Sequence, residues 1–380
     1  MNFVTNPTYV LAVLCFMVIL AVYVGKTKFG KKFGAALLVI LFTAVLANLK
    51  IIPSSSNSIP LYGGIFKYVA PISIFYLLLN VNLTSIKRAG LPMIGLFIIG
   101  SLATTFGILI SWFILEPESV LGESGKVIAG MLTGTYTGGS VNFNAVALEY
   151  DFQEKGVLYA GTIAVDNVVT TLWIIVTLAL PVIMRYFWKD KTNIKSNIHT
   201  ENQSHPEDEN IDIISLMWLI FLGVTAYYIS NVIKEFIPQI PSIITLSTIG
   251  ILLPQTKFVA NLKSSHNLGL YLVFIFLAVI GAYCELDAVF ELKEVGIMLL
   301  LFAGLAVMLH GVIVVLLGGL LYRDWEMIAI VSQANVGGGT TAIALAESFN
   351  RKELILPAIL VGTLGTALGT YLGFFVIYFI

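Results

Sequence analysis

The chain has 380 residues, of which 58% are hydrophobic and only 11% are charged, and its mean hydropathy is +0.92. Because a soluble domain carries roughly a quarter charged residues, this composition excludes an ordinary soluble domain and indicates a polytopic membrane protein. The net charge of -1 says nothing about partners, and there is no basic block that would indicate a nucleic-acid partner. The two cysteines, Cys15 and Cys284, lie in apolar segments, where we expect buried free thiols.

Apolar segments follow one another along the chain in two sets of six. The first set covers 8–24, 34–48, 62–82, 92–115, 126–149 and 156–186, and the second covers 213–233, 239–254, 267–286, 293–321, 325–348 and 353–380. Most segments are near the roughly 17–25 residues that a transmembrane helix needs. The matching order and spacing predict two repeats, residues 1–186 and 213–380, joined by a polar, mobile linker at 187–212.

Two apolar segments are interrupted by glycine and small polar residues at matching places in the two repeats. The first interruption reads Gly134-Thr-Tyr-Thr-Gly-Gly-Ser-Val-Asn-Phe-Asn144, and the second reads Ser332-Gln-Ala-Asn-Val-Gly-Gly-Gly-Thr-Thr341. Such a stretch cannot face lipid, because its freed backbone groups would lack hydrogen-bond partners. Paired interruptions of this kind are typical of the binding site of a transporter. We expect the glycines to let the two arms of a hairpin pack closely.

Charges in the loops indicate how the segments cross the membrane. Lysines in the first loop, and Lys87 and Arg88 in the third, place these loops in the cytoplasm. If all six segments crossed, the linker, which opens with Arg185 and Lys189, would lie outside. The linker falls inside if 126–149 is a re-entrant hairpin that enters and leaves the membrane on one side. The same assumption for 325–348 places Arg351 inside.

We therefore predict an all-α fold of two inverted repeats. Each repeat has five transmembrane helices and one Gly-rich re-entrant hairpin, at about 126–149 and about 325–348. The linker 187–212 is then cytoplasmic. The alternative is twelve plain spans in parallel repeats, which leaves the linker lysines and the Arg351-Lys352 pair on the wrong side.

The hairpin motifs carry a family resemblance. Gly138-Gly139-Ser140-Val141 and Gly337-Gly338-Gly339-Thr340 resemble the Gly-Gly-x-Gly-like hairpin motifs of elevator-type carriers of the ion-transporter superfamily, although the first departs at its fourth position. The sodium–glutamate symporters and the 2-hydroxycarboxylate carriers are the nearest architectural comparison. Over nearly its full length the chain also resembles domain-of-unknown-function family 819, a bacterial and plastid family. The resemblance implies an elevator mechanism and sodium coupling, but it brings no substrate.

The hairpin tips supply most of the candidate binding residues. Amide groups and helix N-termini at a tip suit an anion, and nearby hydroxyl and carbonyl oxygens suit a hard cation such as Na⁺. The alternative role for these polar residues is packing between helices. The candidates for substrate or ion binding are Thr137, Gly138, Gly139, Ser140, Asn142 and Asn144 in the first hairpin, and Gln333, Asn335, Gly337, Gly338, Gly339, Thr340 and Thr341 in the second.

Asp166-Asn167 completes the candidate set. The pair lies in the middle of segment 156–186, and a carboxylate inside the membrane is costly enough to suggest a function. Asp166 could bind Na⁺, carry a proton or bind a cationic group, and the alternative is a structural hydrogen bond. His310, in segment 293–321, is expected to pack between helices outside the site. Glu149, near a hairpin end, is expected to be solvated or to cap a helix.

These observations favour a cation-coupled secondary active transporter, with Na⁺ as the coupling ion and a small anionic organic solute as substrate. We expect it to work as a homodimer in the lipid bilayer of a bacterial plasma membrane, and to need no cofactor besides Na⁺ or H⁺. A cation/proton antiporter that uses Asp166 is the alternative. An intramembrane enzyme ranks last, because the sequence offers no nucleophile–base pair or metal-binding motif.

Overall fold

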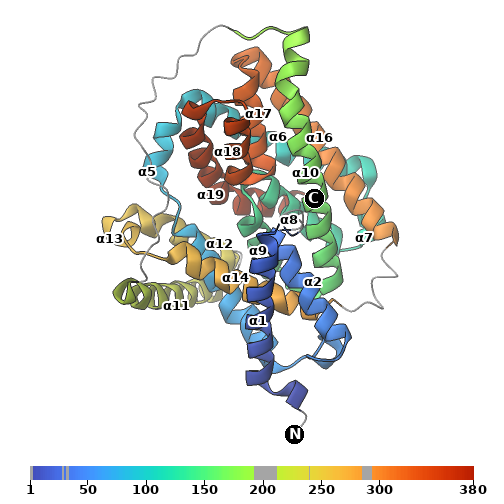
Figure 1. Cartoon of the computed structure of the whole chain (residues 1–380), viewed down its shortest axis with the longest axis vertical. Coiled ribbons are helices and arrows are strands. Elements are labelled where there is room, and N and C mark those ends of the chain that lie inside the picture. The colour runs from blue at the N-terminus through green and yellow to red at the C-terminus, as the bar shows by residue number, and fades with distance from the viewer. Residues whose placement is uncertain (1–2, 28–29, 31–33, 192–211, 239, 285–292) are drawn as a thin grey trace.

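The computed structural model describes residues 3–27, 30, 34–191, 212–238, 240–284 and 293–380, and every element in them is helical (Figure 1). Eight helices in this part of the chain are long and apolar enough to cross a membrane. Two further apolar helices, Ala35–Asn48 and Ser242–Gln255, are shorter. The chain therefore has the architecture of a polytopic membrane protein.

The main helices follow the predicted segments to within a few residues, but the two interrupted segments each form two helices. The first half contains α1 (Pro7–Gly25), α2 (Gly34–Asn48), a continuous helix made of α3 (Pro60–Gly64), η4 (Ile65–Val69) and α4 (Ala70–Leu78), then α6 (Leu91–Leu115), α8 (Ser124–Gly138), α9 (Ser140–Glu149) and α10 (Gly156–Phe187). The second half contains α11 (Ile213–Phe236), α12 (Ser242–Leu252), α14 (Ser265–Ala282), α16 (Lys293–Leu321), α17 (Trp325–Val336), α18 (Gly338–Ser348) and α19 (Ile355–Phe379).

Short elements join these helices. They are α5 (Leu83–Ile86), α7 (Glu118–Leu121), α13 (Lys257–Ala260) and single 3₁₀ turns at Phe3–Thr5, Ser55–Asn57, Lys87–Ala89, Phe152–Glu154, Leu253–Gln255 and Lys352–Leu354. Polar side chains set several helix starts. Asn6 accepts hydrogen bonds from the first amides of α1, where Pro7 needs no partner, and Asp212 and Asp324 cap α11 and α17 in the same way.

The helices divide into two packed groups (Figure 1). We call the first the frame group: α1, α2, α3–α4, α11, α12 and α14, in which α2 and α4 pack on α14 and α12 packs on α4. We call the second the hairpin group: α6, α8, α9, α10, α16, α17, α18 and α19, in which α6 packs on α16, α8 on α19 and α17 on α10. In Figure 1 α17 and α18 lie in the upper part of the molecule, far from α1 in its lower part. The two groups touch where α9 meets α4 and α12, where α12 meets α19, and where α10 meets α14 and α2.

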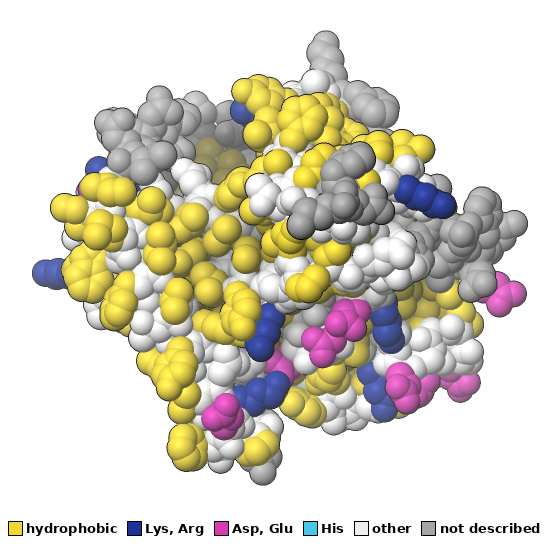
Figure 2. Space-filling model, turned by 90° about the horizontal axis from the view of Figure 1, so that it is seen from below, with side chains coloured by type: hydrophobic (Ala, Val, Ile, Leu, Met, Phe, Trp, Pro, Cys, Tyr) yellow, Lys and Arg dark blue, Asp and Glu magenta, His cyan; other side chains and the backbone are white. Residues whose placement is uncertain are grey.

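Apolar side chains cover much of the outer surface (Figure 2). On the face that Figure 2 shows, hydrophobic side chains spread over most of the molecule, while Asp and Glu side chains lie mainly in its lower half and Lys and Arg side chains are more scattered. Among the exposed apolar residues are Phe16 in α1, Ile175 and Val182 in α10, Met217 in α11 and Leu300 in α16. Exposed apolar surface of this extent is unfavourable in water and is expected of helices that face lipid.

Candidate functional site

Each glycine-rich interruption folds as a tight turn between two helices. Gly139 alone separates α8 from α9, with φ 90° and ψ -178°, a conformation that is essentially restricted to glycine. The chain turns back there, since a Cβ placed on Gly134 of α8 would lie 3.1 Å from the Cβ of Asn142 of α9. Gly337 lies between α17 and α18, and Gly338 has φ 78°.

Gly139 and Gly338 are needed for their backbone conformation and not for close packing of the arms. A Cβ on Gly139 or Gly338 would meet nothing within 4 Å, so the sequence-based expectation of tight arms at these two positions is wrong. The close packing lies at their neighbours. A Cβ on Gly138 would lie 2.0 Å from the carbonyl of Gly365, and a Cβ on Gly362 would lie 2.7 Å from the Cα of Gly339.

Both turns therefore rest on the same helix, α19. Gly362 and Gly365 are three residues apart on α19, so they stand about one turn from each other on one face. The hydroxyl of Thr366 also donates a hydrogen bond of 3.3 Å to the carbonyl of Gly138. The stretch Gly362-Thr-Leu-Gly-Thr366 is thus the platform that brings the two distant turns together.

A cavity of about 480 Å³ opens where the two turns meet. The first hairpin contributes Gly138, Gly139, Ser140 and Val141, and the second contributes Gly337, Gly338, Gly339, Thr340 and Ile343. From α19 come Ile359, Gly362, Thr363 and Thr366, and from the frame group come Leu77, Asn80, Val81 and His266. Ser140 and Thr340 begin the second arms of the two hairpins and are exposed, whereas the last turn of each first arm is buried. We call this space the tip cavity.

The tip cavity is polar but carries little charge. None of its lining residues is Asp, Glu, Lys or Arg, and His266 is the one histidine among them. Helices α9 and α18 both begin at its wall, so their first amide groups have no partner within the helix. The positive ends of two helix dipoles thus meet the same space, which favours an anionic or strongly polar group.

Several predicted site residues do not line the tip cavity and instead hold the hairpins in place. Asn142 donates to the carbonyl of Gly365 at 3.3 Å, and its side-chain oxygen accepts from the amide and the hydroxyl of Thr370 at 3.0 and 2.8 Å. Asn144 accepts a hydrogen bond from the hydroxyl of Tyr159. These buried amides tie the first hairpin to α19 and α10.

The second hairpin is held in a similar way. The Gln333 amide donates to the hydroxyl of Thr341 at 3.0 Å and accepts from Thr177 of α10 at 3.2 Å. The Asn335 amide donates to the hydroxyl of Ser101 on α6 at 3.1 Å. Four further predicted site residues do not line the tip cavity: Thr137, Gln333, Asn335 and Thr341. The predicted set therefore contains two kinds of residue, those that line the cavity and those that hold the hairpins in place.

Asp166 and Asn167 lie in the middle of α10 and are half-buried. The carboxylate of Asp166 accepts a hydrogen bond of 3.5 Å from Thr170, one turn along the helix. The buried side chain of Tyr136, three residues before Gly139, interacts electrostatically with Asp166. Neither Asp166 nor Asn167 lines the tip cavity. A solute held between the two turns would therefore not contact the carboxylate of Asp166 directly.

His310 lies at the junction of several helices in the hairpin group and is 1% exposed. Its Nδ1 atom is 3.0 Å from the Gly100 carbonyl and 3.0 Å from the Thr104 hydroxyl, and its Nε2 atom is 2.9 Å from the Ser332 hydroxyl. Thr104 donates to the Tyr136 carbonyl at the end of α8. His310 therefore does more than the packing between helices that the sequence predicted, because its ring also links the first arms of both hairpins.

Ionic contacts fix the ends of the second hairpin. Arg351 after α18 pairs with Asp324 and Glu326 at 2.9 Å each, and Arg185 at the end of α10 also pairs with Glu326. Burial lowers the pKa of Arg351, but the surrounding carboxylates outweigh this effect and hold the pKa above its usual range. Asp190, in the predicted linker 187–212, accepts from the Trp325 amide. Residues 192–211 of that linker lie outside the described residues.

Sequence reasoning missed the frame-group residues of the tip cavity: Leu77, Asn80, Val81 and His266. They lie far from both interruptions in the chain and carry no motif. Asn80 follows α4 and His266 lies in the first turn of α14. The packing of α4 on α14 brings the two residues together, and the packing of α4 on α9 brings them to the first hairpin. The one signal available in the sequence was a polar residue at the end of an apolar segment, and it exists only for Asn80 and His266.

The long apolar helices and their exposed apolar surface define the class of this protein: a multi-pass integral membrane protein. The chain belongs to the family described as "Protein of unknown function (DUF819)", whose model matches residues 9–380. It is similar to the uncharacterized membrane protein YjcL of Bacillus subtilis (strain 168), with 26% identity over 370 residues, which cover 92% of this chain and 90% of that protein. This bacterial relative is consistent with a place in the bacterial plasma membrane.

Proposed function

We propose that this protein is a cation-coupled secondary active transporter that binds a small anionic organic solute in the tip cavity. The observation that carries the proposal is the meeting of two glycine-rich turns, about 200 residues apart, on one cavity at the starts of α9 and α18. Two helix N-termini supply the positive potential that an anion needs where no arginine or lysine lines the wall.

In this proposal the chain consists of two inverted repeats, 1–186 and 213–380. The five spanning helices of the first repeat are α1, α2, α3–α4, α6 and α10, and those of the second are α11, α12, α14, α16 and α19. The pairs α8–α9 and α17–α18 are the re-entrant hairpins. The division into groups supports this assignment, because corresponding elements of the two repeats fall in the same group: α1 and α11 in the frame group, α6 and α16 in the hairpin group.

The proposed mechanism is of the elevator type. The hairpin group carries the bound solute across the membrane as one body, while the frame group stays in place and forms the contact of a homodimer. The dense packing of both hairpins on α19 supports movement as a unit. Contacts between the groups run through a few helices only, which leaves a surface along which they can slide.

We propose Na⁺ as the coupling ion and Asp166 as its main ligand. A half-buried carboxylate in the middle of an apolar helix needs a compensating cation or proton, and the hydroxyl of Thr170 lies beside it. One observation favours a second candidate, a cation/proton antiporter. Asp166-Asn167 is an acid–amide pair on a helix outside the tip cavity, so the pair could exchange a cation for a proton without an organic solute.

Flux measurements with purified protein in proteoliposomes test the proposal. A panel of carboxylates, amino acids and small peptides is offered with an inward Na⁺ gradient, with a pH gradient, or with neither. The symporter predicts Na⁺-driven uptake of an organic anion, and Asp166→Asn should lose the Na⁺ stimulation. The antiporter predicts pH-driven cation exchange that Asp166→Asn abolishes. Asp190→Asn, outside the membrane-spanning helices, is the matched control. If no gradient drives any flux in the unmodified protein, the transporter proposal is wrong.

A further inference from the structure

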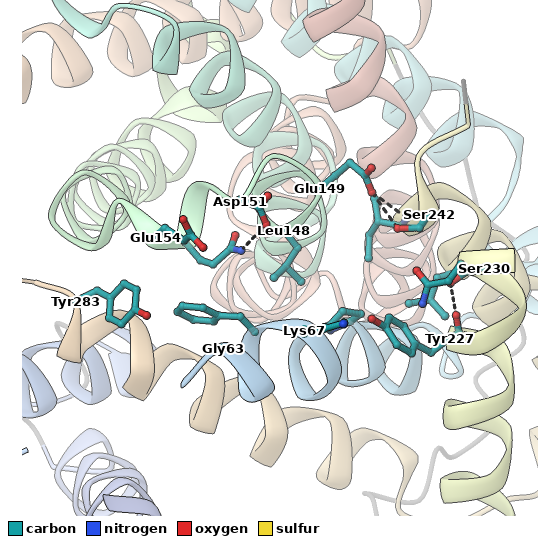
Figure 3. A pocket seen from close by; sticks show the side chains of 16 residues that line it. Gly63, Lys67, Leu148, Glu149, Asp151, Glu154, Tyr227, Ser230, Ser242 and Tyr283 are labelled. Atoms are coloured by element: carbon teal, nitrogen blue, oxygen red, sulfur yellow. Dashed lines mark hydrogen bonds between the residues drawn. The ribbon is translucent and has the colours of Figure 1, made fainter. Parts of the chain in front are cut away.

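A second cavity, of about 340 Å³, lies between the frame and hairpin groups (Figure 3). Its frame-group wall includes Gly63 and Lys67, near the start of the helix Pro60–Leu78, and Tyr283, just after α14. The tip cavity instead touches Leu77 at the end of that helix and His266 at the start of α14. The two cavities therefore lie at opposite ends of the same two frame helices.

Glu149, the last residue of α9, spans the gap between the groups beside this second cavity (Figure 3). Its Oε1 atom accepts from the ammonium of Lys234 on α11 at 2.6 Å. Its Oε2 atom accepts from the hydroxyl of Ser242 at 3.2 Å and from the amide of Ile243 at 3.3 Å. The side chain of Glu149 is only 10% exposed, so a carboxylate at this place needs all three partners.

The carboxylate of Glu149 also completes a helix of the other group. The residue before α12 is Pro241, which offers no side-chain cap to the free amides of the first turn. Glu149 accepts from the amide of Ile243 and from the hydroxyl of Ser242 in that turn, and its negative charge faces the positive end of the helix. A residue of the hairpin group thus serves as the N-terminal cap of a frame helix.

No other ion pair in the described part of the chain joins the two groups. The remaining pairs connect Arg185 or Arg351 with carboxylates on or next to helices of the hairpin group: Asp190, Asp324, Glu326 and Glu353. The Lys234–Glu149 pair alone would break if the hairpin group slid along the frame group. The other pairs would move with the hairpin group unchanged.

We propose that Glu149, with Lys234 and the first turn of α12, is a latch that holds the protein in the conformation in which the tip cavity opens at the His266 end of α14. This inference rests on the proposed function, in which the two groups move relative to each other. Movement of the tips towards the Tyr283 end of α14 would require Glu149 to leave Lys234 and uncap α12. The latch therefore sets the balance between the two access states.

Cysteine accessibility in membrane vesicles tests the latch without a known substrate. The native cysteines are replaced (Cys15→Ser, Cys284→Ser), and Ile343→Cys on the tip-cavity wall reports access. An impermeant maleimide is added to right-side-out and to inside-out vesicles. The latched protein should label mainly from one side. Glu149→Gln should raise the labelling rate from the opposite side at least about tenfold, as expected from the loss of a charge-assisted contact.

Matched variants separate the latch from general damage. Lys234→Met leaves the cap of α12 intact and should shift the labelling in the same direction. The charge-swapped pair Glu149→Lys with Lys234→Glu restores the ion pair but not the cap, so it should recover part of the one-sided labelling. Asp190→Asn breaks a pair of equal length, 2.6 Å, within the hairpin group and should leave the labelling unchanged.

The outcomes also separate this inference from the proposed function. If Glu149→Gln and Lys234→Met both label as the unmodified protein does, the latch is wrong, whether or not gradients drive flux. If they shift the labelling while no gradient drives flux in any preparation, the latch stands as a conformational contact and the transporter proposal fails. A shift in Asp190→Asn equal to that in Glu149→Gln would overturn the specific role of Glu149.

Discussion

Gly138 of α8 lies directly against Gly365 of α19, so that a Cβ on Gly138 would be 2.0 Å from the Gly365 carbonyl. Real Cβ atoms do not approach backbone atoms so closely, and both partners here are backbone, which cannot rotate away. The first hairpin turn can therefore rest on α19 only while both positions are glycine. Because α19 also carries Gly362 under Gly339, the same helix sets the position of both turns.

We predict that Gly138→Ala lowers the free energy of unfolding by about 1–3 kcal/mol or more, the usual cost of overpacking a close contact. Thermal unfolding of the detergent-solubilised protein measures the change. Gly161→Ala on α10 is the control, because a Cβ there meets nothing within 4 Å and alanine favours a helix interior by about 0.5–1 kcal/mol. Equal melting temperatures for Gly138→Ala and the unmodified protein would contradict the packing described for this turn.

Gly139 should respond to substitution in a different way from its neighbour. At Gly139 the cost comes from the backbone, so Gly139→Ala should lose about 1–3 kcal/mol from strain alone. Because no atom lies within 4 Å of its Cβ position, Ala, Ser and Leu should cost nearly the same at Gly139, whereas at Gly138 the cost should rise with side-chain size. Melting temperatures of the two series test this. A steep dependence on size at Gly139 would mean that crowding, and not backbone conformation, selects the glycine.

Much of the helical arrangement could be predicted from the sequence, because it follows from local properties. Apolar length marks the spanning helices, and the glycine-rich stretches mark the breaks at Gly139 and Gly337-Gly338. The reason for each glycine could not be predicted in the same way. Whether a glycine serves a backbone angle, as Gly139 does, or a contact, as Gly138 does, depends on where α19 lies, and that is a long-range property.

The arrangement of the loops across the membrane stays a prediction from the loop charges. We expect residues 116–125 and 150–155 to face the outside, and residues 187–212 and 349–353 to face the cytoplasm. Single cysteines at Ser119, Glu154 and Lys189, each exposed, can be tested with an impermeant maleimide on intact cells. Ser119→Cys and Glu154→Cys should label, and Lys189→Cys should label only after the cells are opened. Labelling of Glu154→Cys only from the inside would contradict the hairpin arrangement.

Of the residues that line the tip cavity, the sequence could predict only residues of the two hairpins. The residues at the two turns, from Gly138 to Ser140 and from Gly337 to Thr340, do line one cavity. The amides Asn142 and Asn335 carry the same polar signal in the sequence but point into helix contacts. A polar side chain next to a glycine turn can serve either purpose, and the choice depends on which helix packs beside it. His310 illustrates the same limit, since an isolated histidine shows no partner in the sequence.

The partners of His310 determine its protonation state in this structure. The Gly100 carbonyl can only accept, so Nδ1 must carry a proton. The Trp173 indole donates to the Ser332 hydroxyl oxygen at 3.1 Å, which leaves the hydroxyl proton of Ser332 free to donate to Nε2. We predict a neutral imidazole protonated at Nδ1, which ¹⁵N chemical shifts of labelled histidine can measure. A signal from the Nε2-protonated form at this position would contradict the hydrogen-bond network.

Removal of the ring should destabilise the hairpin group. In His310→Leu the buried Gly100 carbonyl and the Ser332 hydroxyl each lose one hydrogen bond, and a lost hydrogen bond costs about 0.5–1.5 kcal/mol. Met308→Leu, on the same helix but 54% exposed, is the control and should change the melting temperature little. If His310→Leu melts at the same temperature as Met308→Leu, the ring fills space between helices and does not join the two hairpins.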